Sequence, residues 1–364
     1  MKKIVYILII LIAVTGCNSK KDVNDLETSY SITYNDDYYN VYMPYKKGVG
    51  NNYILNSNTV DYDLDKVEEN LIQISTNEFS TDKYYYQEGQ YLTKKILKEL
   101  LGNKKLNKEK EKKIDGKKIK PQMVGGIIEK NFLNKNGDLK GISLAIILNR
   151  YQSYDSNNNY VVISEDEVIK KGKESGVELV KYMRDKFKLD NIPILVALYV
   201  EASPESNVSG DYVYYGITEN NDIKYKHINQ KNYYMNNQNV KQINSTSYNN
   251  FKKYEDSIRE YDNSIYISGL GYFNNSELSK LSILITKNHY SYGDLLYLNQ
   301  LLSEKAIKYF KDSKVVIKVK AINEIKSYIV KNAGETTTDI FIYWLKYSII
   351  IKRCINLYEK MDKK

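Results

Sequence analysis

The chain has 364 residues, of which 42% are apolar, and this is enough for one large hydrophobic core or two modest ones. Its formal net charge of +9 is mild for this length and is spread through Lys-, Asn- and Tyr-rich sequence. This distribution does not resemble the footprint of a nucleic-acid-binding protein, so we expect no nucleic-acid partner.

Residues 1–16 have the pattern of a signal peptide. Lys2 and Lys3 precede an uncharged apolar run from Ile4 to Val14, and no charge follows until Lys20. The run is too short for a permanent span, because a helix needs about 20 apolar residues to cross a hydrocarbon core of roughly 30 Å. We expect this segment to direct export and then to be removed.

Val14, Thr15, Gly16 and Cys17 resemble a lipobox, in which small residues precede a cysteine that becomes lipidated. The alternative is that Cys17 only ends an ordinary signal peptide, a cleavage that has no use for the cysteine. In the lipobox interpretation the chain is cut before Cys17, and buried acyl methylenes, at about 0.8 kcal/mol each, hold it on the outer face of the cell membrane. The expected partners are the membrane, through this lipid anchor, and the signal peptidase and lipid-transfer machinery.

The segment 17–29 is expected to be a lipidated polar tether, since residues 18–29 contain no aromatic side chain. Cys354 is the only other cysteine, so no intramolecular disulfide can form once Cys17 carries lipid. The folded part is expected to begin near Tyr30 and to depend on its core.

Two distant stretches share a pattern that predicts an internal repeat. Residues 137–149 and 276–288 align so that Leu139 matches Leu278 and Ser143 matches Ser282. Each stretch follows an apolar segment and an Asn-containing turn, which predicts the β-hairpins 126–149 and 266–288.

The order of elements around the hairpins is also repeated. Amphipathic patterns predict helices before and after each hairpin, with strands at both ends of each unit. The predicted helices are 64–74, 165–187, 251–261 and 294–310, and the strands are 30–45, 192–200, 212–218 and 315–321. We expect an α+β fold of two tandem structurally similar units, 30–190 and 191–343, each an antiparallel sheet with helices packed on one face.

The end of the chain is more apolar than its surroundings. Residues 340–351 contain Lys346 and are too short to span a membrane. This pattern predicts a final strand that runs into an amphipathic helix, so the C-terminal extension 344–364 is expected to be helical.

Motifs that carry chemistry are incomplete. Asp61, Asp63 and Asp65 have the spacing that opens a calcium loop, but Lys66 and Ile72 occupy the glycine and glutamate positions, so helix capping is the better interpretation. Ser80 and Lys83 fit S-x-x-K without its companion motifs, and Gly269 and Gly271 lie in a predicted hairpin.

Only His227 and His289 are available for a histidine-based site, and both are expected at the surface or in turns. We therefore predict no catalytic residues, no metal site and no cofactor, and we do not expect an enzyme.

Two surface features leave alternatives open. The lysine-rich segment 104–120 is interpreted as a solvated loop, with a patch for anionic lipid or wall polymer as the alternative. Tyr84–Tyr86 and Tyr233–Tyr234 could stack on sugars or peptides, but packing on a sheet face is the favoured interpretation.

Three blocks resemble the CamS family of sex-pheromone precursor lipoproteins from low-GC Gram-positive bacteria: 81–92 (TDKYYYQEGQYL), 191–199 (NIPILVALY) and 329–336 (IVKNAGET). The first is the most specific, and the two-unit organisation agrees with the family's tandem repeats. The extension after Tyr343 departs from the family pattern.

The resemblance implies that a short hydrophobic peptide from the end of the signal sequence is released as a pheromone that affects plasmid transfer. The corresponding peptide here is Ile10, Leu11, Ile12, Ala13, Val14, Thr15 and Gly16. Its uncharged side chains suit passage through membranes and binding to an apolar peptide receptor. The mature domain is expected to be non-catalytic, and the alternative function is a ligand-binding lipoprotein that holds a cell-wall fragment or peptide between its two units.

Overall fold

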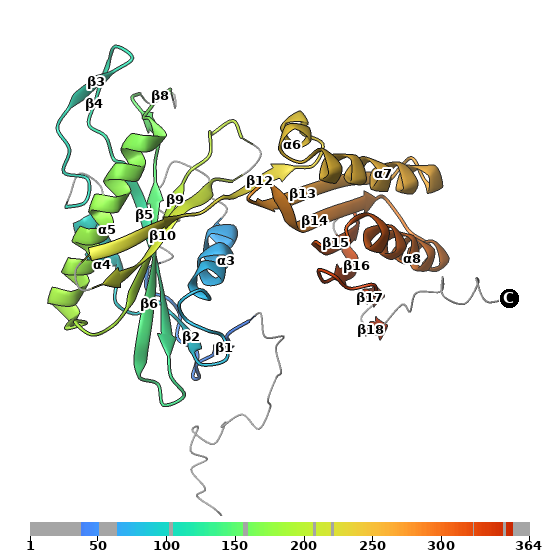
Figure 1. The fold of residues 1–364 in the computed structure, drawn as a ribbon, viewed down its shortest axis with the longest axis horizontal. Coiled ribbons are helices and arrows are strands. Elements are labelled where there is room, and N and C mark those ends of the chain that lie inside the picture. Colours follow the sequence, from blue (N-terminus) through green and yellow to red (C-terminus); the bar gives the residue numbers. More distant parts are fainter. Residues whose placement is uncertain are drawn as a thin grey trace, which may run out of the picture.

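The computed structural model describes most of the chain after residue 37, namely residues 38–50, 64–101, 105–155, 159–206, 209–219, 222–322, 324–344 and 347–351. The expected signal peptide, lipobox, pheromone peptide and 17–29 tether lie outside these residues. Within them, the strands form two large sheets and two small hairpins (Figure 1).

The first sheet contains seven described strands in the order β1-β2-β5-β6-β9-β10-β11. The predicted hairpin is confirmed as β5 and β6, which pair antiparallel, and Gly137 adopts a positive φ of 84° in their turn. The strands are β1 Asn40–Val41, β2 Tyr85–Glu88, β5 Val124–Leu133, β6 Leu139–Leu148, β9 Ile194–Val200, β10 Asp211–Glu219 and β11 Asp222–His227.

Helices cover both faces of this sheet (Figure 1). The helices α4 (Lys94–Leu100) and α5 (Glu165–Phe187) pack on one face, and α3 (Leu64–Ser75) packs on the other. Strand β9 is therefore buried along its whole length, as is β6 from residue 141 to its end. This double burial explains why β9 is a continuous apolar run instead of an alternating one.

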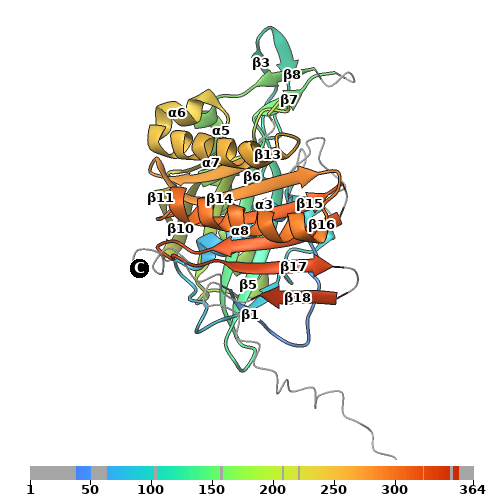
Figure 2. The same ribbon diagram turned by 90° about the vertical axis from the view of Figure 1, so that its right-hand side faces the viewer.

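The second sheet has seven described strands in the order β12-β13-β14-β15-β16-β17-β18. Figure 2 looks onto α7 and α8, which lie in front of these strands. The strands are β12 Gln230–Tyr234, β13 Tyr266–Asn274, β14 Glu277–Lys287, β15 Lys314–Ala321, β16 Glu324–Lys331, β17 Asp339–Trp344 and β18 Tyr347–Ile351. The helices are α6 Gln238–Ile243, α7 Ser245–Tyr261 and α8 Tyr292–Tyr309.

Strand residues of the second sheet alternate between a buried and a half-exposed side. On β15, Val315, Ile317 and Val319 are buried in the core that includes α7 and α8. The residues between them are only partly buried. This period of two is the expected pattern for a sheet that is covered on one face.

The α+β class and the two similar units are confirmed, and each sheet carries a hairpin followed by a helix and a parallel strand. Two details differ from the prediction. Both sheets are mixed, because α5 and α8 connect the parallel pairs β6–β9 and β14–β15. The first sheet also has helices on both faces.

The chain passes from the first sheet to the second between β11 and β12, at Ile228 and Asn229, whereas the boundary predicted from the sequence lies near residue 190. Strand β10 pairs antiparallel with β9, with Tyr215 opposite Ala197. The expected boundary near residue 190 groups β9 and β10 with the second unit, but the pairing of β9 with β6 and of β10 with β9 makes them part of the first sheet.

Two other segments also differ from their predictions. The C-terminal extension begins with strand β18, which pairs with β17 at the edge of the second sheet, so the expected helix does not start within 347–351, and residues 352–364 lie outside the described residues. In the lysine-rich segment, β3 (Lys112–Ile114) and β4 (Lys117–Ile119) form a hairpin instead of a loop. A second small hairpin joins β7 (Tyr151–Ser153) to β8 (Tyr160–Val162).

None of the helices in the described ranges is long and apolar enough to cross a membrane.

Candidate functional site

The residues predicted to be processed, Ile10 to Cys17, lie outside the described residues, so the structure places the mature domain and not the cleavage site. The remaining predicted motifs are all structural. Lys83 donates its backbone N–H to Ser80 in a turn that leads into β2, and Gly269 and Gly271 face the core side of β13. Asp65 lies in the first turn of α3, while residues 61–63 are outside the described ranges.

Both histidines are exposed, as predicted, and His227 packs edge-on against Tyr214 at the end of β11. Among the residues that the structure describes, no three His, Cys, Asp or Glu side chains are grouped to hold a metal ion. The tyrosine patches follow the packing interpretation, since Tyr85 contacts Tyr42 and Tyr233 contacts Phe273.

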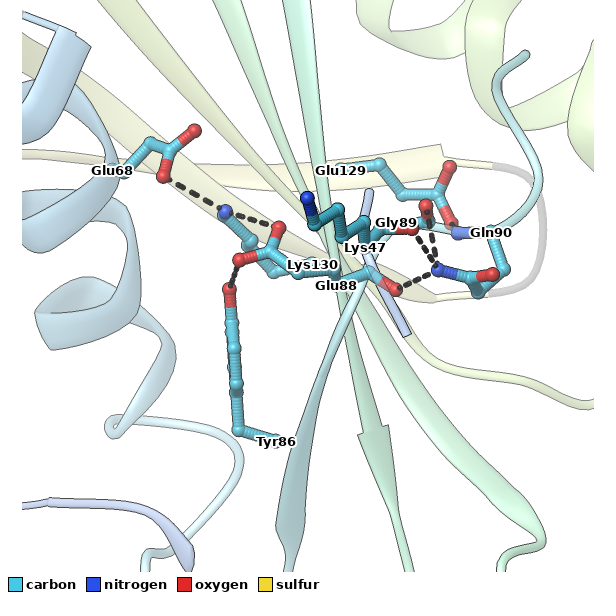
Figure 3. Close-up of polar contacts among 8 residues, drawn as sticks. All are labelled: Lys47, Glu68, Tyr86, Glu88, Gly89, Gln90, Glu129 and Lys130. Atoms are coloured by element: carbon cyan, nitrogen blue, oxygen red, sulfur yellow. Dashed lines mark hydrogen bonds and ion pairs between the residues drawn. The ribbon is translucent and has the colours of Figure 1, made fainter. Parts of the chain in front are cut away.

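The Thr81–Leu92 block holds a buried ionic network on the α3 side of the first sheet (Figure 3). Lys130 on β5 is fully buried, and its Nζ lies 2.7 Å from Oε2 of Glu88 and 3.1 Å from Oε2 of Glu68. Tyr86 donates its hydroxyl to Oε1 of Glu88 at 2.5 Å. The network therefore joins α3, β2 and β5 through one ammonium group.

Burial raises the pKa of the Tyr86 hydroxyl, and the hydrogen bond to Glu88 and the charges of Glu88 and Glu68 raise it further. The phenol thus stays protonated and donates to Glu88 across the physiological range. The Lys130 ammonium also lies 5.7 Å from the centre of the Tyr86 ring, within the range of a cation–π contact.

A second carboxylate fixes the end of the same block on the opposite face of β5. Glu129 accepts backbone N–H groups from Gln90, Tyr91 and Leu92, with the shortest contact of 2.7 Å from Leu92 to Oε2. Burial raises the pKa of Glu129, and these three amides act in the opposite direction. The side chain holds the loop that leads into α4.

Gly89 is required where the two halves of the block meet. A Cβ atom at this position would lie 2.6 Å from both Cβ and the backbone oxygen of Glu129. Gln90 stabilises the bend next to it, because its Nε2 donates to the carbonyls of Lys47, Glu88 and Gly89 (Figure 3). The E-G-Q sequence is therefore explained by close backbone approach.

The 329–336 block contains a second fully buried lysine. Lys331 donates its Nζ to the backbone carbonyls of Lys311 at 2.6 Å, Asn332 at 2.9 Å and Ser313 at 3.2 Å. Burial lowers the pKa of this ammonium, while the charges of Asp312 and Glu335 act to raise it. Neither lysine was predicted from the sequence, although Lys130 stands next to Glu129 within the largely apolar β5 and Lys331 ends β16 after the apolar pair Ile329–Val330.

The two units meet through a small polar junction. Asn232 on β12 donates its Nδ2 to Oδ1 of Asp211 on β10 at 3.0 Å, and Lys280 Nζ lies 3.1 Å from Glu69 Oε1 on α3. The cavity shared by the units at this junction has a volume of about 10 Å³ and is lined by Asn70, Ile74, Asp211, Tyr212, Gln230 and Asn232. This is room for about one water molecule, whereas ligand pockets measure about 300–1,000 Å³.

Comparison with known sequence families gives two matches. Residues 45–337 match the profile described as CamS sex pheromone cAM373 precursor, and residues 1–18 match the profile of a prokaryotic membrane lipoprotein lipid attachment site. No curated protein matches the chain significantly.

Two solved structures share the fold. One is the sex pheromone precursor of Lactobacillus salivarius subsp. salivarius UCC118, with a TM-score of 0.76, 24% identity, and coverage of 85% of this chain and 97% of that chain. The other is the C-terminal domain of the sex pheromone staph-cAM373 precursor of Staphylococcus aureus, with a TM-score of 0.69, 24% identity, and coverage of 78% and 97%.

Proposed function

Because the chain belongs to the CamS family of sex pheromone precursors and carries a lipoprotein attachment site, we propose that one cleavage before Cys17 yields two products. The first is a lipoprotein anchored by Cys17 on the outer face of the membrane. The second is the signal peptide, whose last residues, Ile10 to Gly16, form a hydrophobic pheromone peptide that affects conjugative plasmid transfer. The observation that carries this proposal is that a chain matching this family also matches a lipid attachment site over residues 1–18, a range that contains the peptide.

The peptide chemistry supports the proposal. Ile10 to Gly16 contains no charged side chain and no side chain larger than leucine or isoleucine. Burial of such side chains in a receptor groove contributes roughly 25 cal/mol per Å² of apolar surface. A short peptide of this kind can therefore bind a protein receptor without an ionic partner.

We propose that the mature domain is non-catalytic. Its buried charged groups at Lys130, Glu129 and Lys331 are engaged in holding strands and loops together. The alternative, a ligand site between the units, has little support at the junction, where the shared cavity is about 10 Å³.

The test is mass spectrometry of culture supernatant and of the membrane fraction from cells that express the chain. We expect the Ile10–Gly16 peptide in the supernatant and a diacylated Cys17 at the mature amino terminus. Cys17→Ala and Gly16→Asp should abolish both products, while Cys354→Ala, the matched control at the only other cysteine, should leave both unchanged. Normal lipidation without the peptide would refute the pheromone proposal.

A further inference from the structure

The second sheet has one face that no helix of its own unit covers. Helices α7 and α8 lie on one side of it, and α3 of the first unit stands beside the other side (Figure 1). Strand register places alternate residues on this second side, which we call the open face. Its members on the central strands are Leu270, Tyr272, Lys280, Ser282, Leu284, Lys314, Val316, Lys318, Lys320, Tyr328 and Val330.

The open face is basic. Lys280 on β14 lies next to Lys314 on β15, and Lys318 and Lys320 follow on the same strand. The row from Lys314 to Lys320 extends about 20 Å at about 3.3 Å per residue. Asp339, opposite Val330 at the start of β17, is the acidic residue that the register of the described strands places here.

Lys318 and Lys320 have no acidic partner within ion-pair distance among the described residues, whereas Lys280 pairs with Glu69. Lys318 lies 5.4 Å from the centre of the Tyr328 ring, which in turn meets Tyr343 edge-on at 6.1 Å. Cationic and aromatic side chains are therefore interleaved on one surface.

The first unit provides an internal comparison. At the equivalent face of the first sheet, β6 and β9 present Ala145, Ile147, Leu195 and Ala197, and α3 covers them. The positions of β15 that correspond to Leu195 and Ala197 are Lys318 and Lys320, and charged side chains at these positions do not form a surface on which an apolar helix can pack. The composition of the open face fits a charged and hydrophilic partner instead.

We infer that the open face binds an extracellular anionic polymer whose repeating units carry phosphate and polyol or sugar groups. The lysines form a row and do not converge on one point, so they match repeated charges better than a single anion. Tyrosine supplies flat contact area with a hydroxyl tip, which suits polyol and sugar units. Because α3 stands beside the open face, a flat bilayer surface has less access to this face than an extended polymer chain has.

The test uses the mature chain without its acyl group and four probes: soluble poly(glycerol phosphate), inorganic polyphosphate, neutral dextran, and phosphatidylglycerol vesicles. We expect binding of poly(glycerol phosphate) that weakens as salt rises, with no binding of dextran. Lys318→Glu with Lys320→Glu should weaken this binding at least about 10-fold. Both side chains are partly exposed, and circular dichroism checks that the variant is folded.

The matched control is Lys253→Glu with Lys308→Glu, which makes the same charge change at exposed positions on α7 and α8. It should leave the affinity within about two-fold, since these charges are remote from the polymer. Equal losses in the two double variants, or binding of vesicles without binding of the polymer, would overturn the inference.

Tyr328→Ala should weaken poly(glycerol phosphate) binding more than binding of inorganic polyphosphate, which has no polyol units. Equal losses of affinity for the two polymers would refute the claim that Tyr328 contacts a polyol or sugar unit.

Discussion

Two buried lysines show two ways to stabilise an ammonium group inside a protein. Transfer of an ion from water to the interior costs several kcal/mol unless new contacts compensate. Lys130 is compensated by the two carboxylates of Glu68 and Glu88, and Lys331 by three backbone carbonyls. Removal of Lys130 therefore leaves two facing carboxylates, whereas removal of Lys331 leaves neutral acceptors.

We expect Lys130→Met to lower the free energy of unfolding by about 3 kcal/mol, because Glu68 and Glu88 then repel each other in a poorly solvated site. Urea denaturation measures this change. Lys140→Met on β6 is the control. The Lys140 side chain is 45% exposed and its ion pair with Asp138 is long, at 3.8 Å, so its loss should cost less than about 0.5 kcal/mol. Equal effects of the two substitutions would contradict a structural role for the network.

The role of Lys130 could have been inferred in part from the sequence. Glu129 and Lys130 are adjacent charges within the largely apolar strand VGGIIEKNFL, and such charges must find partners when the strand is buried. The partners themselves were not predictable, because Glu68 and Glu88 come from other elements and reach Lys130 only through tertiary packing.

At the scale of elements, the local sequence pattern predicts the helices and hairpins that are stabilised by contacts between residues close in the chain. The hairpin β13–β14 follows from alternation and an Asn-Asn turn, and α5 follows from its apolar stripe and the N-cap Ser164. The position of β10 depends on its pairing with β9 across a long loop, and the residue pattern of β10 would suit a strand in either sheet. The sequence pattern therefore predicts that β10 is a strand but does not predict to which sheet it belongs.

Strand β10 also begins with a group that gives the junction a pH dependence. Burial raises the pKa of Asp211 to about 7, and Lys231 opposes this effect while Glu165 adds to it. In the unfolded chain the pKa of aspartate is about 3.9. Between these values the folded state binds a proton that the unfolded state releases, so stability falls as pH rises.

We expect the contribution of protonated Asp211 to the free energy of unfolding to be complete below pH about 4 and to be lost as pH rises through about 7. Asp211→Asn keeps an oxygen acceptor for Asn232, so it should flatten this slope and stabilise the protein by about 2 kcal/mol at pH about 8. Urea midpoints across this pH range measure the effect. Asp222→Asn, at the exposed start of β11, is the control, and parallel profiles for Asp211→Asn and wild type would refute the assignment.

At the scale of the whole molecule, each sheet has a core of its own. The second core includes Leu281 and Ile317 and contains residues of β13 to β17 with α7 and α8, while Leu144 belongs to the core beneath α4 and α5. The connection is the short link at Ile228 and Asn229, with few polar contacts. Such a link couples the two units weakly, so we expect them to unfold separately.

Hydrogen exchange followed by mass spectrometry makes this separation measurable, since peptides from β14 and β15 report on the second sheet and peptides from β6 and β9 report on the first. The exchange of each set of peptides should follow the opening of its own sheet. Ile317→Ala and Leu144→Ala remove equally buried side chains and should each cost about 2–5 kcal/mol in their own unit. We expect Ile317→Ala to lower the urea concentration at which the β14 and β15 peptides lose protection and to leave that of the β6 and β9 peptides in place, and Leu144→Ala to do the reverse. If both variants shift both sets of peptides together, the two sheets form one cooperative unit, and the junction at Asp211 and Asn232 couples them far more strongly than its few contacts indicate.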